Sequence, residues 1–297
     1  MFEGLVQLPE IQLFVRQYGR SGPRVVIVHG GPDWDHTYFL PFVLPLAAHC
    51  RLTLFDLRGC GRSQKLGDPS AYHIDLAVAD LTALIGALDL APVNLLGFSY
   101  GGRVALRFTD RHPELVSRLV LASTTAYEDY AADLERWDEY QRREAAGINA
   151  EIERITDDNT CSNEEQTRRW AAASAPLNLY DLALLPRYRE VLDRVRFSGE
   201  WMAALKAGKL AGVRHADYGS RLSELGLPVL VLHGEKDMCF PVSVAKRLHA
   251  AVTRSKLVVI PHAGHMAHIE ATEAWNAAVQ EFVCGQGGVT PRRRLAP

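Results

Sequence analysis

The stretch Pro92-Val93-Asn94-Leu95-Leu96-Gly97-Phe98-Ser99-Tyr100-Gly101-Gly102 decides the fold. Its first five residues form an apolar, strand-like segment, and a helix-like segment follows at residues 103–108. Between them lies the pattern Gly-x-Ser-x-Gly, which is typical of a serine held on a sharp turn between a strand and a helix. Glycines on either side of Ser99 leave room for so tight a turn. The pattern therefore predicts that the Ser99 hydroxyl stands at the tip of the strand, over the positive end of the next helix.

Short runs rich in Val, Leu and Ile recur along the rest of the chain and alternate with helix-like stretches such as 74–88. The runs lie at 25–28, 52–55, 92–96, 119–122, 229–232 and 257–260, after a strand pair at 5–8 and 11–18. Continuous apolar strands separated by helices predict a mostly parallel sheet covered on both faces. The fold class is therefore α/β, with an open, doubly wound sheet.

One segment interrupts this alternation, from about residue 124 to residue 221. Charged, helix-prone stretches at 132–146 and 150–155 replace the strand runs. We interpret the segment as a helical cap inserted after the sixth strand, over the strand ends where α/β proteins bind ligands. The alternative is a packing domain without substrate contact. The predicted domains are a core at 1–123 and 222–284, a cap at 124–221, and a flexible tail at 285–297 that carries Arg292-Arg293-Arg294.

Composition narrows the class of protein. The 297 residues are 47% hydrophobic with a formal net charge of −2, so we expect an ample core and neither a nucleic-acid nor a membrane partner. The sequence has neither a signal-peptide pattern nor an apolar run of about 18 residues. Five scattered cysteines without Cys-x-x-Cys spacing favour reduced thiols (Cys50, Cys60, Cys161, Cys239, Cys284). We expect a cytoplasmic protein without a cofactor; the oligomeric state is left open.

A serine hydroxyl is a poor nucleophile near neutral pH and needs a base, which in turn needs a third group to orient it. The strand at 229–232 runs into a loop that contains Glu235 and Asp237, and the strand at 257–260 runs into a loop that contains His265. Both loops follow strands at the edge where Ser99 is expected, and the chain order Ser, Asp, His is one of the known triad orders. We predict Ser99 as nucleophile, His265 as base and Asp237 as orienting acid. Asp237 is preferred to Glu235 because it lies one turn beyond the strand.

Each of these residues also has an ordinary structural interpretation. Ser99 could cap a helix, Asp237 could form a turn, and His265 could be a surface or capping histidine. The spacing His262-x2-His265-x2-His268 suggests a metal site, but such spacing on an irregular loop without an organised acid is poor ligand geometry. We therefore expect no metal.

Two glycine-rich turns follow early strands. His29-Gly30-Gly31-Pro32 lets the backbone approach a ligand closely, and we predict that the N–H groups of Gly31 and Tyr100 form an oxyanion hole. One such donor is typically worth about 2.7–4 kcal/mol of activation free energy. The alternative is a turn without a donor role. The second turn, at 56–63, resembles a phosphate loop only loosely, and we interpret it as a structural turn in which an Asp–Arg pair supports the serine turn.

Together, these motifs resemble the α/β-hydrolase superfamily over about residues 5–283. Within it they are most similar to proline iminopeptidases, with motifs H-G-G-P-G, D-x-x-G-x-G-x-S and G-x-S-[WY]-G-G. The resemblance implies release of an N-terminal proline or small residue from short peptides. Two positions differ: Asp33 replaces the last glycine of the first motif, and Met238 stands where such peptidases tend to have a glutamate that holds the substrate amine.

A free ammonium group in an apolar pocket needs a carboxylate partner. Acids of the cap are candidates for that role, although acids on helices are more often solvated (Glu135, Asp138, Glu139). We therefore predict a cofactor-independent serine hydrolase for a small ester, lactone or related acyl compound, with a preference for an uncharged acyl group. The alternatives are an iminopeptidase-type aminopeptidase and a ligand-binding protein on a hydrolase scaffold. Haloalkane or epoxide chemistry is disfavoured because it needs a carboxylate nucleophile at position 99.

Overall fold

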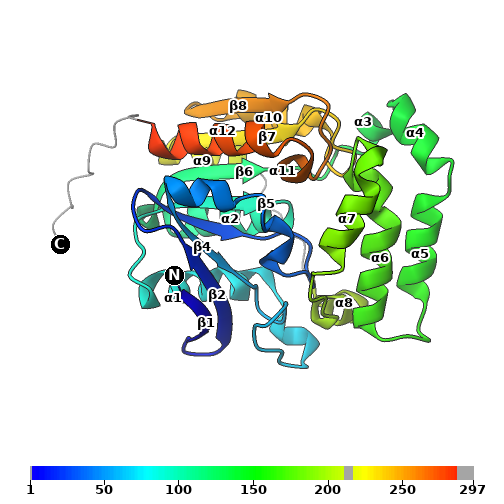
Figure 1. The fold of residues 1–297 in the computed structure, drawn as a ribbon, viewed down its shortest axis with the longest axis horizontal. Helices are drawn as coiled ribbons and strands as arrows, with labels where there is room; N and C mark the ends of the chain where they lie inside the picture. Colours follow the sequence, from blue (N-terminus) through cyan, green and yellow to red (C-terminus); the bar gives the residue numbers. More distant parts are fainter. Residues whose placement is uncertain (1, 211–216, 286–297) are drawn as a thin grey trace.

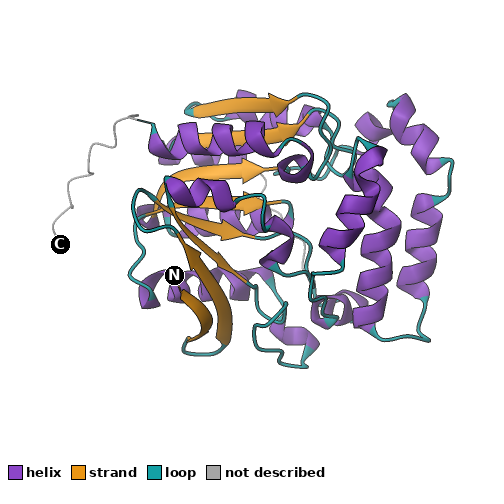
Figure 2. Ribbon diagram, viewed as in Figure 1, coloured by secondary structure: helices purple, strands orange, loops and turns teal. Residues whose placement is uncertain are grey.

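The computed structural model describes residues 2–210 and 217–285, and its centre is one eight-stranded sheet. The strand order is β1-β2-β4-β3-β5-β6-β7-β8; β1 and β2 run antiparallel to their neighbours and the other pairs are parallel (Figure 2). The strands are β1 (Phe2–Gln7), β2 (Gln12–Tyr18), β3 (Arg24–Val28), β4 (Arg51–Phe55), β5 (Val93–Phe98), β6 (Val116–Ala122), β7 (Val229–Gly234) and β8 (Ser255–Ile260). The predicted α/β class is confirmed.

Helices cover both faces of the sheet (Figure 1). Alternate residues of a strand point to opposite faces, and both sets are apolar here, so each face is buried under helices. In β3, Val26 and Val28 join one buried cluster while Val25 and Ile27 join the other. The first cluster includes α1 (Ile74–Ala87), α2 (Tyr100–Arg111), α9 (Tyr218–Leu225) and α10 (Val242–Ala251). The second includes α12 (Thr272–Cys284) and the 3-10 helices η1 (His36–Phe39) and η2 (Leu44–Ala48).

A group of helices lies between β6 and β7 in the chain and stands beyond the ends of the strands (green, right side of Figure 1). It comprises α3 (Ala131–Glu135), α4 (Asp138–Glu144), α5 (Ile148–Asp157), α6 (Asn163–Asn178), α7 (Leu185–Leu192) and α8 (Glu200–Lys206). The helical stretch expected at 132–146 is divided into α3 and α4 at Arg136 and Trp137. The next helix, α9, packs on α2 and α10, although the sequence assigned its first residues to the cap; the division of the chain into core and cap stays a prediction.

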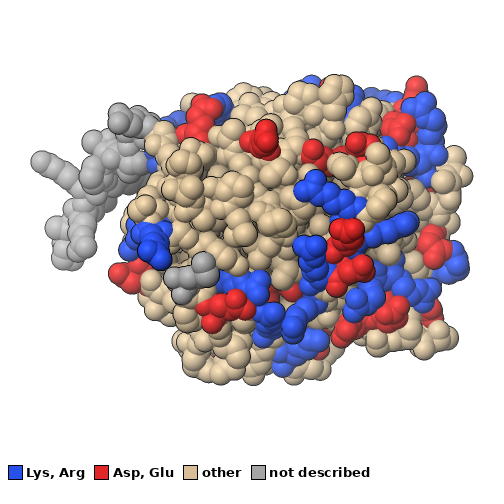
Figure 3. Space-filling view, viewed as in Figure 1, with Lys and Arg blue, Asp and Glu red and all other residues tan. Residues whose placement is uncertain are grey.

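On the face seen in Figure 3, acidic and basic side chains are interspersed and gather over the lower and right-hand parts of the molecule. The tail expected from residue 285 onward, with its three arginines, lies outside the described residues except for Gly285. Among the described residues, no helix is both long and apolar enough to cross a membrane.

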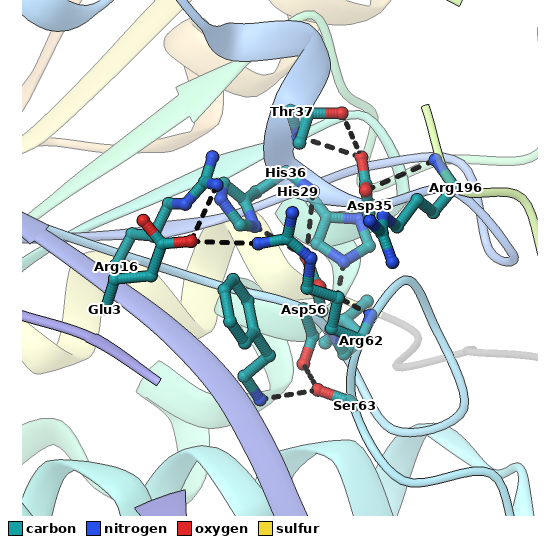
Figure 4. A network of polar contacts seen from close by, with 12 residues as sticks. Glu3, Arg16, His29, Asp35, His36, Thr37, Asp56, Arg62, Ser63 and Arg196 are labelled. Atoms are coloured by element: carbon teal, nitrogen blue, oxygen red, sulfur yellow. Dashed lines mark hydrogen bonds and ion pairs between the residues drawn. The ribbon is translucent and has the colours of Figure 1, made fainter. Parts of the chain in front are cut away.

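The glycine-rich turn after β4 is held by a buried carboxylate (Figure 4). Asp56 accepts hydrogen bonds from the ring (2.5 Å) and backbone N–H (3.1 Å) of His36 and from the backbone N–H of Arg62 (2.9 Å). Burial opposes ionisation, but these partners hold the pKa of Asp56 below its ordinary value. Arg16 and Arg62 both contact Glu3, at 2.9 and 3.0 Å. The network joins the turn at 56–63 to the loop that carries Gly31.

The predicted Asp–Arg pair of this turn is formed with an acid outside it. Arg58 bonds to both carboxylate oxygens of Asp80 in α1, at 2.8 Å each, and to the carbonyl of Ala71 at 2.7 Å. Both side chains of the pair are less than 8% exposed. Burial raises the pKa of Asp80 although Arg58 opposes the shift. The pair therefore fixes geometry more than it contributes net stability.

We expect Arg58→Met to lower the free energy of unfolding by about 3–5 kcal/mol, because it leaves the Asp80 carboxylate buried without its ion pair. Urea denaturation measures the change. The double variant Arg58→Met/Asp80→Leu should recover most of the loss, and Arg142→Met, at a 72% exposed arginine, should stay close to wild type. A single variant as stable as wild type would contradict the buried pair.

Candidate active site

Ser99 occupies the sharp turn between β5 and α2. Its backbone has φ 52° and ψ −121°, a left-handed conformation that costs a non-glycine residue roughly 1–3 kcal/mol. The hydroxyl makes no capping bond to α2, so the alternative of a simple helix cap does not hold. Its oxygen lies 3.0 Å from Nε2 of His265.

The glycines on either side of the serine are required by close packing. A Cβ at Gly97 would lie 2.5 Å from the carbonyl oxygen of Gly101, and one at Gly101 would lie 2.2 Å from the carbonyl oxygen of Val28. Any side chain at these two positions would push α2 away from β3 and β5. The Gly-x-Ser-x-Gly pattern thus has a steric cause in this structure.

The structure brings Ser99, His265 and Asp237 together. Nδ1 of His265 lies 2.9 Å from Oδ2 of Asp237, and Oδ1 of Asp237 accepts the N–H groups of Cys239 and Phe240, both at 2.8 Å. Asp237 therefore forms a turn and also orients the imidazole. Burial disfavours its charge, but the imidazoles of His265 and His233 hold the pKa of Asp237 below its ordinary value.

The competing acid and histidines lie elsewhere. The side chain of Glu235 is 40% exposed, near Lys236, and accepts the backbone N–H of exposed His262 at 3.3 Å. The three histidines 262, 265 and 268 do not form a metal-binding group among the described residues. Possible ligand atoms of Asp237, Cys239 and His265 lie within 4.8 Å of one another, but this carboxylate and imidazole already bond to each other.

The two predicted oxyanion donors border the same cavity as Ser99. None of the described residues accepts a hydrogen bond from the N–H of Gly31 or from that of Tyr100, the first residue of α2. The neighbouring Gly30 N–H, by contrast, donates to the Tyr38 hydroxyl at 2.7 Å. The donor role of both N–H groups stays a prediction.

A cavity of about 530 Å³ opens beside Ser99, between the strand ends and the inserted helices. This is the size of cavity that binds small molecules. Its walls are mostly aromatic and aliphatic. The insertion contributes Thr156, Thr167, Trp170, Asn178, Trp201, Met202 and Leu205.

Asp33, which departs from the iminopeptidase motif, ties the insertion to the core. Its buried carboxylate accepts the Ser198 hydroxyl at 2.5 Å and the N–H groups of Trp201 and Met202 at 2.9 and 2.7 Å. The last two belong to the first turn of α8, where a negative charge is favourable. Burial raises the pKa of Asp33 although these donors oppose the shift. The sequence analysis did not predict this role. The one sequence feature that pointed to it was the presence of Asp33 where the iminopeptidase motif has glycine.

Two further acids, the buried Asp35 and the half-buried Glu270, make similar connections. Asp35 accepts the backbone N–H of Arg196 at 3.2 Å (Figure 4). Glu270 accepts the N–H groups of Tyr180 and Asp181, at 2.8 and 3.0 Å, and that of Gly264 at 2.6 Å. Burial raises the pKa of both acids. Glu270 thereby links the insertion to the loop that carries His265.

His268 lies behind the site among aromatic rings. It is fully buried against Tyr38, Phe39, Phe98 and Trp275, and neither ring nitrogen has a hydrogen-bond partner among the described residues. Burial lowers the pKa of His268 to about 3. The imidazole is therefore neutral in the folded protein.

We expect His268 to make the protein acid-sensitive. Its folded pKa lies below the unfolded value, so its contribution to stability is complete above about pH 6.5 and is lost as the pH falls toward 3. Between pH 6.5 and pH 5 the loss is about 2 kcal/mol. Urea denaturation at pH 7.5 and pH 5 should show a larger acid loss for wild type than for His268→Phe. His112→Phe is the control for removing one histidine; equal losses in wild type and His268→Phe would contradict a buried neutral imidazole.

Comparison with known proteins gives one sequence family and a consistent set of structural neighbours. A profile of the alpha/beta hydrolase fold matches residues 23–272. A proline iminopeptidase of Levilactobacillus brevis is 28% identical, over 90% of each chain. An esterase from Thermogutta terrifontis is 25% identical, with a TM-score of 0.71 over 95% of this chain and 97% of its own. An enol-lactonase from Burkholderia xenovorans is 20% identical, with a TM-score of 0.70 over 94% and 99%, which shows a shared fold.

Proposed function

The chain belongs to the alpha/beta hydrolase fold family, and from this we propose that it is a serine hydrolase that cleaves a small ester, lactone or related acyl compound through an acyl-enzyme. The observation that carries the proposal is the continuous chain of hydrogen-bond distances from Asp237 through His265 to the Ser99 hydroxyl, 2.9 and 3.0 Å. A serine so placed, beside an apolar cavity of small-molecule size, is suited to acyl transfer.

In this proposal, Nε2 of His265 takes the Ser99 proton as the serine oxygen attacks the substrate carbonyl. The oxygen of the tetrahedral intermediate accepts the N–H groups of Gly31 and Tyr100. The imidazolium then returns its proton to the leaving oxygen, and the C–O bond breaks to give the acyl-enzyme. Water, deprotonated by His265, attacks the acyl-enzyme and releases the acid, which restores Ser99.

Asp237 acts through His265 in this scheme. It accepts Nδ1–H, which leaves Nε2 free to take the serine proton, and its negative charge stabilises the imidazolium that forms. The carboxylate is fully buried, so its effect on the imidazole is weakly screened by solvent. Its bonds to the Cys239 and Phe240 backbone fix its position before the substrate arrives.

We expect Ser99→Ala to lower kcat for p-nitrophenyl butyrate at least about 10³-fold, because the covalent step is lost. Ser70→Ala, at an exposed serine outside the cavity, should retain wild-type kcat. A fluorophosphonate probe should label wild type and Ser70→Ala, but not Ser99→Ala, as read by intact mass. Undiminished turnover by Ser99→Ala would refute the proposal.

The second candidate is an iminopeptidase-type aminopeptidase, which the names of several relatives favour. The charges around the cavity favour the esterase. Glu135 and Asp138 are exposed, and Glu139 bonds to Arg142 and Arg143. Met238, at the position of the amine-binding glutamate, is buried.

Among the described residues that line the cavity, Asp33 is the single carboxylate. Its oxygens are occupied by the three donors of the insertion. A substrate ammonium group in the cavity therefore has no free carboxylate partner among these residues.

A direct comparison of substrates separates the two candidates. We expect short-chain p-nitrophenyl esters to be hydrolysed, and prolyl and alanyl p-nitroanilides to be cleaved at least about 100-fold more slowly, since an unpaired ammonium group is costly to bury. N-acetylated anilides test the amine requirement, and Ser99→Ala measures background. Rapid cleavage of the free-amine anilides alone would establish the aminopeptidase instead.

A further inference from the structure

Arg103 is a cationic side chain in the wall of the cavity. It lies one helical turn after Ser99 along α2 and is half-buried. Its guanidinium carbon lies 5.8 Å from the ring centroid of Phe240, and that ring meets the His265 ring edge-on at 5.5 Å. A single aromatic ring thus lies between the guanidinium and the catalytic imidazole.

The arginines of α2 differ in their partners. Arg107 and Arg111 both bond to Asp75, at 2.7 and 2.9 Å. Arg103 has neither a hydrogen bond nor an ion pair with any described residue, and its guanidinium lies over the ring of Phe240. A guanidinium has five N–H donors and always carries its charge, so one in a cavity wall without a protein acceptor can bind an anionic group of a ligand.

The rest of the cavity leaves this charge uncompensated. Its one described carboxylate, Asp33, already accepts three hydrogen bonds from backbone and hydroxyl donors of the insertion. The other polar side chains near the serine are neutral, among them Asn178, Thr156 and Thr167. An anion is therefore favoured in this cavity and an ammonium group is disfavoured.

We propose that Arg103 binds a carboxylate of the substrate, so that the preferred substrate is a small ester or lactone with a carboxylate several bonds from the scissile carbonyl. The inference rests on the proposed serine-hydrolase function. The planar fork of a guanidinium matches both oxygens of a carboxylate. A position over the Phe240 ring does not use the N–H donors of Arg103, and none of them bonds to a described residue. The apolar walls accommodate the carbon chain between the two groups. If the carboxylate lies on the alcohol side, the expected preference for an uncharged acyl group holds as well; a carboxylate on the acyl side would replace it.

Matched esters test the proposal on both sides of the scissile bond. The acyl-side series is the p-nitrophenyl monoester of adipic acid, p-nitrophenyl hexanoate and the p-nitrophenyl ester of 6-aminohexanoic acid, which differ in terminal charge. The alcohol-side pair is the butanoyl ester of 3-hydroxybenzoate against that of 3-hydroxybenzamide. The readout is the ratio of kcat/KM for the carboxylate ester to kcat/KM for its neutral counterpart.

We expect this ratio to fall about 10- to 100-fold in Arg103→Met for at least one of the two sets, as expected for loss of a charge-assisted hydrogen bond. Arg103→Lys should keep part of the preference, and the amino ester should be the poorest substrate of wild type. The wild-type ratio should also decline as sodium chloride is added. Arg111→Met removes the same charge from the far end of α2, which lies outside the cavity, and should keep the wild-type ratio.

The outcomes separate this inference from the function on which it rests. Hydrolysis that persists in Ser99→Ala would refute the serine-hydrolase proposal itself. Serine-dependent hydrolysis with the same ratio in wild type and Arg103→Met, for both sets, would refute the carboxylate site alone. Thermal unfolding of each variant establishes that it is folded, and Arg103→Gln replaces Arg103→Met if the latter is not.

Discussion

The backbone of Ser99, held in a left-handed conformation between β5 and α2, is the constraint on which the rest of the structure depends. Such a conformation persists only where its surroundings determine it. The Ser99 N–H donates to the Ala122 carbonyl of β6 at 3.0 Å, and the Ser99 carbonyl accepts the Thr124 hydroxyl at 2.6 Å. Both peptide groups of the serine are thus fixed by β6 and the residues after it. The central position of β5 in a parallel sheet is what makes this support available from a neighbouring strand.

Because Ser99 is fixed, Asp237 and His265 must be positioned by the rest of the sheet. The parallel register of β6, β7 and β8 brings the loops after β7 and β8 to the same edge of the sheet, and these loops carry Asp237 and His265. The backbone N–H of Lys236 bonds to the Ala263 carbonyl at 2.8 Å, which joins the two loops directly. Glu270 then binds the His265 loop to the insertion through Gly264. The geometry at Ser99 is therefore a property of several strands and of the helices that cover them.

The parts of this structure that sequence alone predicts are those set by local steric rules. Gly97 and Gly101 predict the turn at Ser99. The apolar runs that precede Asp237 and His265 predict two loops at one edge, because the carboxyl ends of parallel strands meet there. The role of Asp33 was not predictable in this way, since its partners lie 165 or more positions away in the chain. Arg103 likewise reads as an ordinary helix residue. That Asp75 of α1 pairs with Arg107 and Arg111, and that no described acid pairs with Arg103, depends on how α1 and α2 pack in three dimensions.

The three acids that bond to the insertion bear on what the cavity can bind. Asp33 is buried in the wall of the cavity, whereas Asp35, which is buried, and Glu270, which is half-buried, are not among the described residues that line it. Each of the three accepts backbone N–H groups of the insertion, so these carboxylates join two parts of the chain. The Arg103 guanidinium, which has no ion-pair partner among residues 2–210 and 217–285, favours an anionic group of a ligand in the cavity. Asp33, which replaces a glycine of the iminopeptidase motif, thus holds the insertion over the serine. It is also the one described carboxylate in the cavity wall, and it already accepts three donors of the insertion.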